Sequence, residues 1–282
     1  MKAIILNLSA WIMLPIMDGF AKYLSSTLPV LQITWSRYFF TVAIVLPVML
    51  IFFRKNLVWT EQPKLQLIRG LLLFCANILF FYSISVISLA KALTLAFIAP
   101  LIVTILSPIF LGEKVGIRRW VAVIVGFIGS LIVLRPGFVE INLASFAALG
   151  TGVLYGFYLI VTKKLHKSDH PLLTLLLTGV VGGIIGSLIV PSVWVQPTIT
   201  EWYMMFAIGF FASIGHLFLI LSLKYADASK LAPFGYFEII TNIIIGYYFF
   251  NHFPGNWTFI GLFIIISSGI YIFRREAINI SN

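Results

Sequence analysis

Apolar residues form long continuous runs along this chain, and short polar connections separate them. We find ten such runs, none with the period-2 alternation typical of a strand. A bilayer core about 30 Å thick is crossed by about 20 apolar residues in a helix, so each run predicts a membrane-spanning helix. The predicted spans are roughly residues 3–24, 31–53, 66–87, 91–111, 117–135, 143–163, 172–193, 202–223, 230–250 and 256–273.

The composition supports a life in lipid. Hydrophobic residues make up 61% of the 282 residues and charged residues only 10%, and the mean hydropathy is +1.06. Soluble domains are about 25% charged, so this chain has too few charges to cover a water-facing surface. We therefore predict an all-α integral membrane protein whose partner is the lipid bilayer, and we expect no nucleic-acid binding despite the net charge of +10.

The placement of positive charge predicts the orientation. With the N-terminus in the cytoplasm, all 19 Lys and Arg fall on the inner side, Arg69 among them, except Lys22, Arg37, Lys91 and Arg135. Inner connections of membrane proteins carry such an excess of positive charge. We predict a multi-pass protein with both termini in the cytoplasm.

The chain carries a weak internal repeat. A shift of 139 residues places Ser83 on Ser222, and it superposes the hydropathy of predicted helices 3–5 on helices 8–10. Because five is odd, the second half enters the membrane from the opposite face, which gives the inverted repeat common among secondary transporters. We predict two five-helix units, residues 1–137 and 138–282, with a site near the bilayer midplane between them.

Several short motifs make the sequence similar to a known family. They are Arg69-Gly70, Ala99-Pro100-Leu101, Gly112-Glu113, Arg118-Arg119-Trp120, Arg135-Pro136-Gly137, Ala232-Pro233-Phe234 and Trp257-Thr258. The chain resembles the EamA family of the drug/metabolite transporter superfamily over nearly its whole length. The resemblance implies a ten-helix carrier of small metabolites in a bacterial inner membrane, and its relatives export amino acids or take up S-adenosylmethionine, riboflavin or choline. The sequence departs from the family pattern at Lys91 and Gly235, where many relatives carry an acidic residue.

Charged groups inside the spans are the first site candidates, because each costs at least about 2.5–3.5 kcal/mol at the centre of a membrane helix. Glu238 lies about eight residues, or roughly 12 Å, inside its span. It is expected either to bind a substrate amine or a coupling proton, or to form a structural ion pair. Asp18 and Lys22 share a helix face at i,i+4, so we expect a salt bridge between them, with a gate contact as the alternative.

Other polar residues have two interpretations each. Lys91 either extends to the interface or attracts a substrate carboxylate at the outer mouth of a cavity. Arg37 is expected to donate hydrogen bonds between helices. His216 and Asn77 coincide under the 139-residue shift, and both are expected to bond between helices, with a substrate or proton role as the alternative for His216.

Aromatic and proline residues complete the candidates. Six deep aromatic residues are expected to line a pocket or to pack: Trp11, Tyr82, Phe97, Tyr155, Tyr158 and Tyr236. Pro100, Pro108 and Pro233 interrupt backbone hydrogen bonding inside spans, and we expect them to act as hinges.

Motifs for other functions are absent from the sequence. There is no P-loop, no HExxH and no GxSxG, and Cys75 is the single cysteine. We therefore expect no enzyme, no cofactor and no bound metal. The principal hypothesis is a secondary, alternating-access carrier of a small polar zwitterion or amine held between Lys91 and Glu238, with protons or a counter-substrate as further partners. The alternatives are uptake or exchange of a larger metabolite such as S-adenosylmethionine or riboflavin, and a membrane-embedded lipid-handling protein or enzyme.

Overall fold

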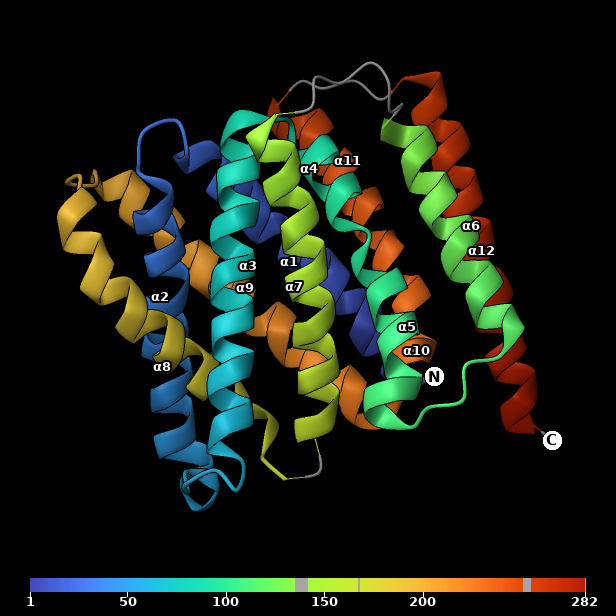
Figure 1. Cartoon of the computed structure of the whole chain (residues 1–282). Coiled ribbons are helices and arrows are strands. Elements are labelled where there is room, and N and C mark those ends of the chain that lie inside the picture. The colour runs from blue at the N-terminus through green and yellow to red at the C-terminus, as the bar shows by residue number, and fades with distance from the viewer. Residues whose placement is uncertain (135–141, 167, 251–254, 282) are drawn as a thin grey trace.

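The computed structural model describes residues 1–134, 142–166, 168–250 and 255–281, and every regular element in these ranges is helical (Figure 1). The motif at 135–137 and the predicted boundary between residues 137 and 138 lie outside the described residues. The elements are α1 (Lys2–Leu24), α2 (Val30–Phe52), η1 (Arg54–Asn56), α3 (Pro63–Val86), α4 (Leu89–Ala96), α5 (Ala99–Leu111), α6 (Ile117–Leu134), α7 (Leu143–Leu165), α8 (Pro171–Ile189), η2 (Val190–Val193), α9 (Ile199–Tyr225), α10 (Ala228–Leu231), η3 (Ala232–Phe237), α11 (Glu238–Phe250) and α12 (Asn256–Ser281).

Seven helical segments of the described chain are long and apolar enough to cross a membrane. They are Lys2–Leu24, Val30–Phe52, Pro63–Val86, Leu89–Leu111, Leu143–Leu165, Pro171–Val193 and Ile199–Tyr225. The other three predicted spans coincide with α6, with α10 to α11 and with α12, which the seven do not include. The prediction of an all-helical, multi-pass membrane protein is confirmed.

Two spans predicted as continuous helices are divided. The first is cut into α4 and α5 between Ala96 and Ala99, and Pro100 stands in the first turn of α5, where its missing N–H costs no hydrogen bond. The second is cut into α10, η3 and α11, with Pro233 near the start of η3. Pro108, in contrast, lies inside α5 without ending it.

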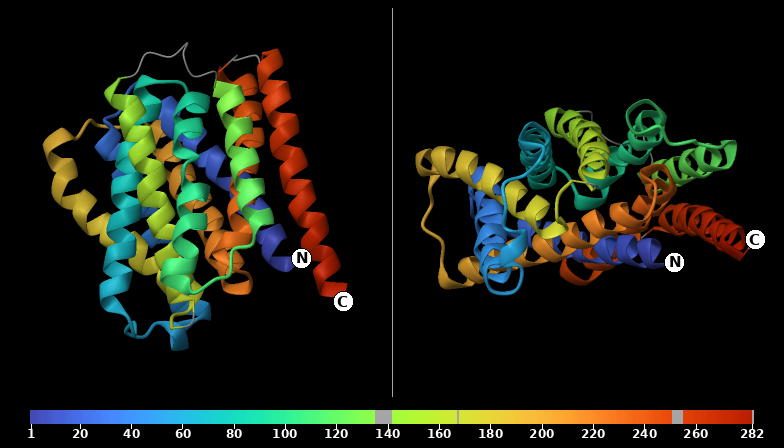
Figure 2. Two further views of the ribbon diagram at one scale, coloured as in Figure 1. Left: turned by 45° about the vertical axis from the view of Figure 1, so that its right-hand side comes forward. Right: turned by 90° about the horizontal axis from the view of Figure 1, so that it is seen from below.

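The helices pack in four long pairs. α1 runs along α9, α3 along α7, α2 along α8, and α6 along α12. Figure 2 shows the α2–α8 pair at one edge of the bundle and the α6–α12 pair at the other. The divided helices lie with α1, α3, α7 and α9 between these edges, so the centre of the bundle contains the breaks in the backbone.

Small residues permit the close approach of α8 to α2. A Cβ on Gly182 would lie 2.4 Å from the Tyr38 ring, and Gly179 and Gly186 face Val42 and Trp35 at 3.0 and 3.2 Å. The interpretation of these glycines as packing residues is confirmed. Gly183, on the same helix, has nothing within 4 Å of the Cβ position.

Candidate functional site

The central helices enclose a cavity. Its empty space is about 910 Å³, including its open part, which is the size of a small-molecule site. The walls come from α1, α3, α4, α5, α7, α9, α10, η3 and α11. Both divided helices contribute walls, so a change at either break would reshape the cavity.

Two carboxylic acids line this cavity, Asp18 of α1 and Glu238 at the first position of α11. Their side chains are close enough to interact electrostatically. The Asp18 side chain is buried, and its Oδ1 atom has no hydrogen-bond partner among the described residues. A buried acceptor without a partner is costly, and a ligand donor or a proton would satisfy it.

The expected Asp18–Lys22 salt bridge is wrong. The Lys22 ammonium donates instead to the main-chain oxygens of Ile84 and Ile87 at the end of α3. The last carbonyls of a helix have no partner within the helix, and the ammonium satisfies them in a region that excludes water. The Asp18 carboxyl therefore remains available to the cavity.

Aromatic side chains form a large part of the wall. Trp11, Phe97 and Tyr155 line the cavity as predicted, and Phe80 joins them. The Trp11 and Tyr155 rings meet edge to face with centroids 6.4 Å apart. The buried Tyr155 hydroxyl has no hydrogen-bond partner within the described chain, so it is a second polar group directed at a potential ligand.

Asn7 is a cavity residue that the sequence analysis missed. Its Oδ1 accepts from Trp11 Nε1 at 2.7 Å, and its Nδ2 donates to Ser222 Oγ at 3.3 Å. The signal was present, because Asn7 is a lone polar residue four positions before Trp11 in an apolar run. These bonds fix the indole at the side of the cavity.

A buried polar network stands behind one wall. His216 lines the cavity, its Nε2 meets Arg37 Nη2 at 2.6 Å, and its Nδ1 meets the Tyr158 hydroxyl at 3.0 Å. Arg37 thus bonds between helices, as predicted. Tyr158 accepts from Arg69 Nη2 at 2.7 Å and lies outside the cavity lining.

Arg69 requires a correction, because the sequence analysis counted it with the inner connections. It is fully buried and donates to Thr162 Oγ1 at 2.8 Å and to the Thr174 main-chain oxygen at 3.0 Å, and it also bonds Thr178. A guanidinium carries five donors, and α7 and α8 supply acceptors around it, which makes burial tolerable.

Asn77 and His216, which coincide under the 139-residue shift, both line the cavity from α3 and α9. Asn77 donates to the Tyr38 hydroxyl at 2.6 Å. The interhelical bonds predicted for both residues are confirmed. The repeat therefore places one polar side chain from each half on the cavity wall.

Several other candidates lie away from the cavity lining. Lys91 is half-buried in the first turn of α4, with its main-chain N–H 3.4 Å from Ser88 Oγ. Tyr236 packs its ring on Phe97, with centroids 5.4 Å apart, and donates to the Val123 main-chain oxygen at 3.1 Å. The remaining candidates outside the lining are Lys22, Arg37, Tyr82, Tyr158, Pro108 and Pro233, whereas Pro100 lies on it.

Comparison with known proteins places the chain among transporters. The sequence matches the EamA-like transporter family over residues 1–135 and 142–274. It is 30% identical to an S-adenosylmethionine uptake transporter of Rickettsia bellii (strain RML369-C) over 262 residues, which are 92% of this chain and 89% of the relative. It is 27% identical to a riboflavin transporter of Vibrio cholerae over 95% of this chain and 92% of the relative. One solved crystal structure superposes with a TM-score of 0.79 over 99% of both chains at 18% identity, which shows the likeness of the fold.

Proposed function

Because the chain belongs to the EamA-like transporter family, we propose that it is an alternating-access carrier that takes up or exchanges a cationic metabolite such as S-adenosylmethionine. One observation carries this proposal: Asp18 and Glu238 line a cavity that contains no Lys or Arg among its described lining residues. The site therefore has negative charge to offer and no fixed cation to balance it. A cation, supplied by the substrate or by protons, compensates the two acids.

The remaining walls suit the rest of such a molecule. S-adenosylmethionine carries a positive sulfonium, an ammonium, a carboxylate and an adenine ring. Aromatic faces such as those of Trp11 and Tyr155 attract cations and stack on rings. The names of the Rickettsia relatives support the same substrate class.

The helix bounds support a repeat of two inverted five-helix units, within residues 1–137 and 138–282. A shift of 139 residues takes the end of α3 to the end of α9, the start of α4 to the start of α10, and the start of α6 to the start of α12. The packing of α1 on α9 and of α3 on α7 agrees with a two-fold relation between the units. Such units can rock about a central site and expose it alternately to each face. We place the carrier in a bacterial inner membrane with both termini in the cytoplasm.

Two other substrates receive less support from the geometry. A small zwitterion held between Lys91 and Glu238 requires Lys91 on the cavity wall, and Lys91 is not among the lining residues. Riboflavin, suggested by the Vibrio cholerae relative, carries no positive charge to compensate the acids. The names of the relatives lend no support to a lipid-handling protein or an enzyme.

Thermal unfolding of the detergent-purified protein tests the proposal. A ligand at 100 times its Kd stabilises the folded state by about 2.7 kcal/mol. We expect S-adenosylmethionine to raise the unfolding temperature, and S-adenosylhomocysteine, which lacks the methyl group and the positive sulfur, to raise it less. Counterflow in vesicles should then show saturable exchange of S-adenosylmethionine. Stabilisation and flux with riboflavin alone would overturn the choice of substrate.

A further inference from the structure

Two lysines make the same pair of contacts in different halves of the chain. Lys22 Nζ donates to the main-chain oxygens of Ile84 and Ile87. Lys163 Nζ donates to those of Leu223 and Ala226 at 2.9 and 2.8 Å. The acceptors are related by the 139-residue shift, since 84 + 139 = 223 and 87 + 139 = 226.

The donors are equivalent as well. Lys22 stands two residues before the end of α1 at Leu24, and Lys163 stands two residues before the end of α7 at Leu165. The end of α1 lies at the top of the bundle in Figure 1, and the end of α7 lies at the bottom. The two contacts therefore sit at opposite ends of the molecule.

Each lysine fastens the segment that leads into a divided helix. Lys22 bonds the end of α3 directly before α4, and Lys163 bonds the end of α9 directly before α10. Both short helices reach the cavity, α4 through Leu93 and α10 through Ala228. Each contact thus controls the position of a segment that covers one end of the cavity.

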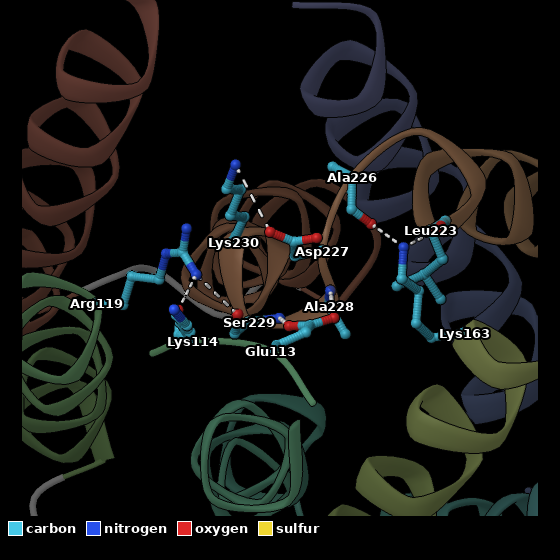
Figure 3. Close-up of polar contacts among 10 residues, drawn as sticks. All are labelled: Glu113, Lys114, Arg119, Lys163, Leu223, Ala226, Asp227, Ala228, Ser229 and Lys230. Atoms are coloured by element: carbon cyan, nitrogen blue, oxygen red, sulfur yellow. Dashed lines mark hydrogen bonds and ion pairs between the residues drawn. The ribbon is translucent and has the colours of Figure 1, made fainter. Parts of the chain in front are cut away.

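The α10 end carries a second fastening, drawn in Figure 3. The Glu113 carboxylate, which follows α5, accepts from the main-chain N–H groups of Ala228 and Ser229 at 2.8 and 2.9 Å. Arg119 donates to Ser229 Oγ at 3.1 Å and to the Lys114 main-chain oxygen at 3.0 Å. These bonds join the first half of the chain to the second at a residue of the cavity wall.

The residue equivalent to Glu113 under the shift is His252, which lies outside the described residues and carries no carboxylate. The Glu113 clasp is therefore a feature that the sequence does not repeat at the other end. The lysine contact, in contrast, occurs in both halves.

We propose that Lys22 and Lys163 are the latches of two gates, one at each end of the cavity, and that each must release before its end opens. Glu113 adds a clasp to the Lys163 gate, so the carrier without substrate keeps the α10 end closed more firmly than the α4 end. The inference rests on the proposed alternating access and is independent of the identity of the substrate.

Thiol labelling tests the latches. In a Cys75→Ser background, Leu93→Cys reports on the α4 end and Ala228→Cys on the α10 end. Each reporter is combined with Lys22→Met, Lys163→Met or the control Lys164→Met, which changes the exposed neighbour of Lys163. The detergent-purified protein is labelled with a charged methanethiosulfonate, and the rates are compared.

We expect Lys163→Met to speed labelling at Ala228→Cys about tenfold, as the loss of one charge-assisted hydrogen bond implies, without speeding it at Leu93→Cys. Lys22→Met should do the reverse, and Lys164→Met should change neither rate. Acceleration of both reporters by both variants would mean general loosening and would overturn the proposal, as would no change at either.

Variants that retain a donor protect the test against loss of folding. Lys22→Gln and Lys163→Gln should give smaller shifts with the same opposite pattern, and its absence in folded protein would also overturn the proposal. Because labelling uses no substrate, a failure of S-adenosylmethionine to bind would refute the proposed cargo and leave this result standing.

Discussion

Single residues decide what the cavity can hold. Spacing alone pairs Asp18 with Lys22 on one face of α1, yet the ammonium bonds the end of α3 instead. A surface helix would satisfy those carbonyls with water, whereas a helix end in a membrane protein has to find donors from the protein. Asp18 consequently joins Glu238 as an uncompensated acid on the cavity wall.

The charge of these acids gives a prediction about ligand choice. Glu238→Gln and Asp18→Asn should each weaken S-adenosylmethionine binding about 10-fold to 100-fold, because a buried charge interaction is worth several kcal/mol at most. Binding of S-adenosylhomocysteine should fall less, so the preference between the two ligands should shrink. Isothermal titration of both ligands measures this ratio, with the exposed Glu61→Gln as the control. An unchanged preference in both variants would refute the role of the acids.

Two neighbouring tyrosines give a matched pair for stability. The Tyr155 and Tyr158 rings stack with centroids 5.3 Å apart, but only the Tyr158 hydroxyl has hydrogen-bond partners, His216 and Arg69. Tyr158→Phe should destabilise the protein by about 1–3 kcal/mol, because it leaves buried groups without a partner. Tyr155→Phe should leave stability unchanged or raise it. Thermal unfolding without ligand checks both, and an equal loss in the two variants would contradict the network.

At the scale of the helices, the breaks follow from backbone chemistry that the sequence already displays. Pro100 and Pro233 have no N–H to donate, and each stands at an interruption of its span. Pro108 shares this chemistry but lies on the exposed side of α5, and the helix continues through it. Sequence therefore identifies where a helix can break, and packing decides where it does.

The packing of α8 on α2 gives a prediction that uses adjacent positions. Gly182→Ala would place a Cβ 2.4 Å from the Tyr38 ring, whereas Gly183→Ala would meet nothing within 4 Å. Overpacking costs about 1–3 kcal/mol, and Ala is favoured over Gly in a helix by up to about 1 kcal/mol. Gly182→Ala should therefore lower the unfolding temperature and Gly183→Ala should hold or raise it. Equal effects would show that α8 is less tightly packed on α2 than described.

At the scale of the whole molecule, hydropathy predicted the helical, multi-pass architecture because the bilayer imposes one length on every span. The 139-residue shift also anticipated that Asn77 and His216 share a cavity. The sequence did not reveal that Arg69 is buried among threonines of α7 and α8, or that Asn7 holds Trp11. Those contacts depend on which helices are neighbours, and hydropathy is the same for many arrangements of equally apolar helices.

The arrangement of the spans predicts which connections face each side of the membrane. The α1–α2 connection lies at the top of the bundle in Figure 1 and the α2–α3 connection at the bottom. Ser26 and Trp59 are exposed in these two connections, and replacing them changes no charge that guides insertion. In a Cys75→Ser background, an impermeant maleimide should label Ser26→Cys in intact bacteria, and Trp59→Cys only after permeabilisation. The opposite result would invert the orientation, and it would exchange the faces to which the Lys22 and Lys163 gates open while leaving the latches themselves in place.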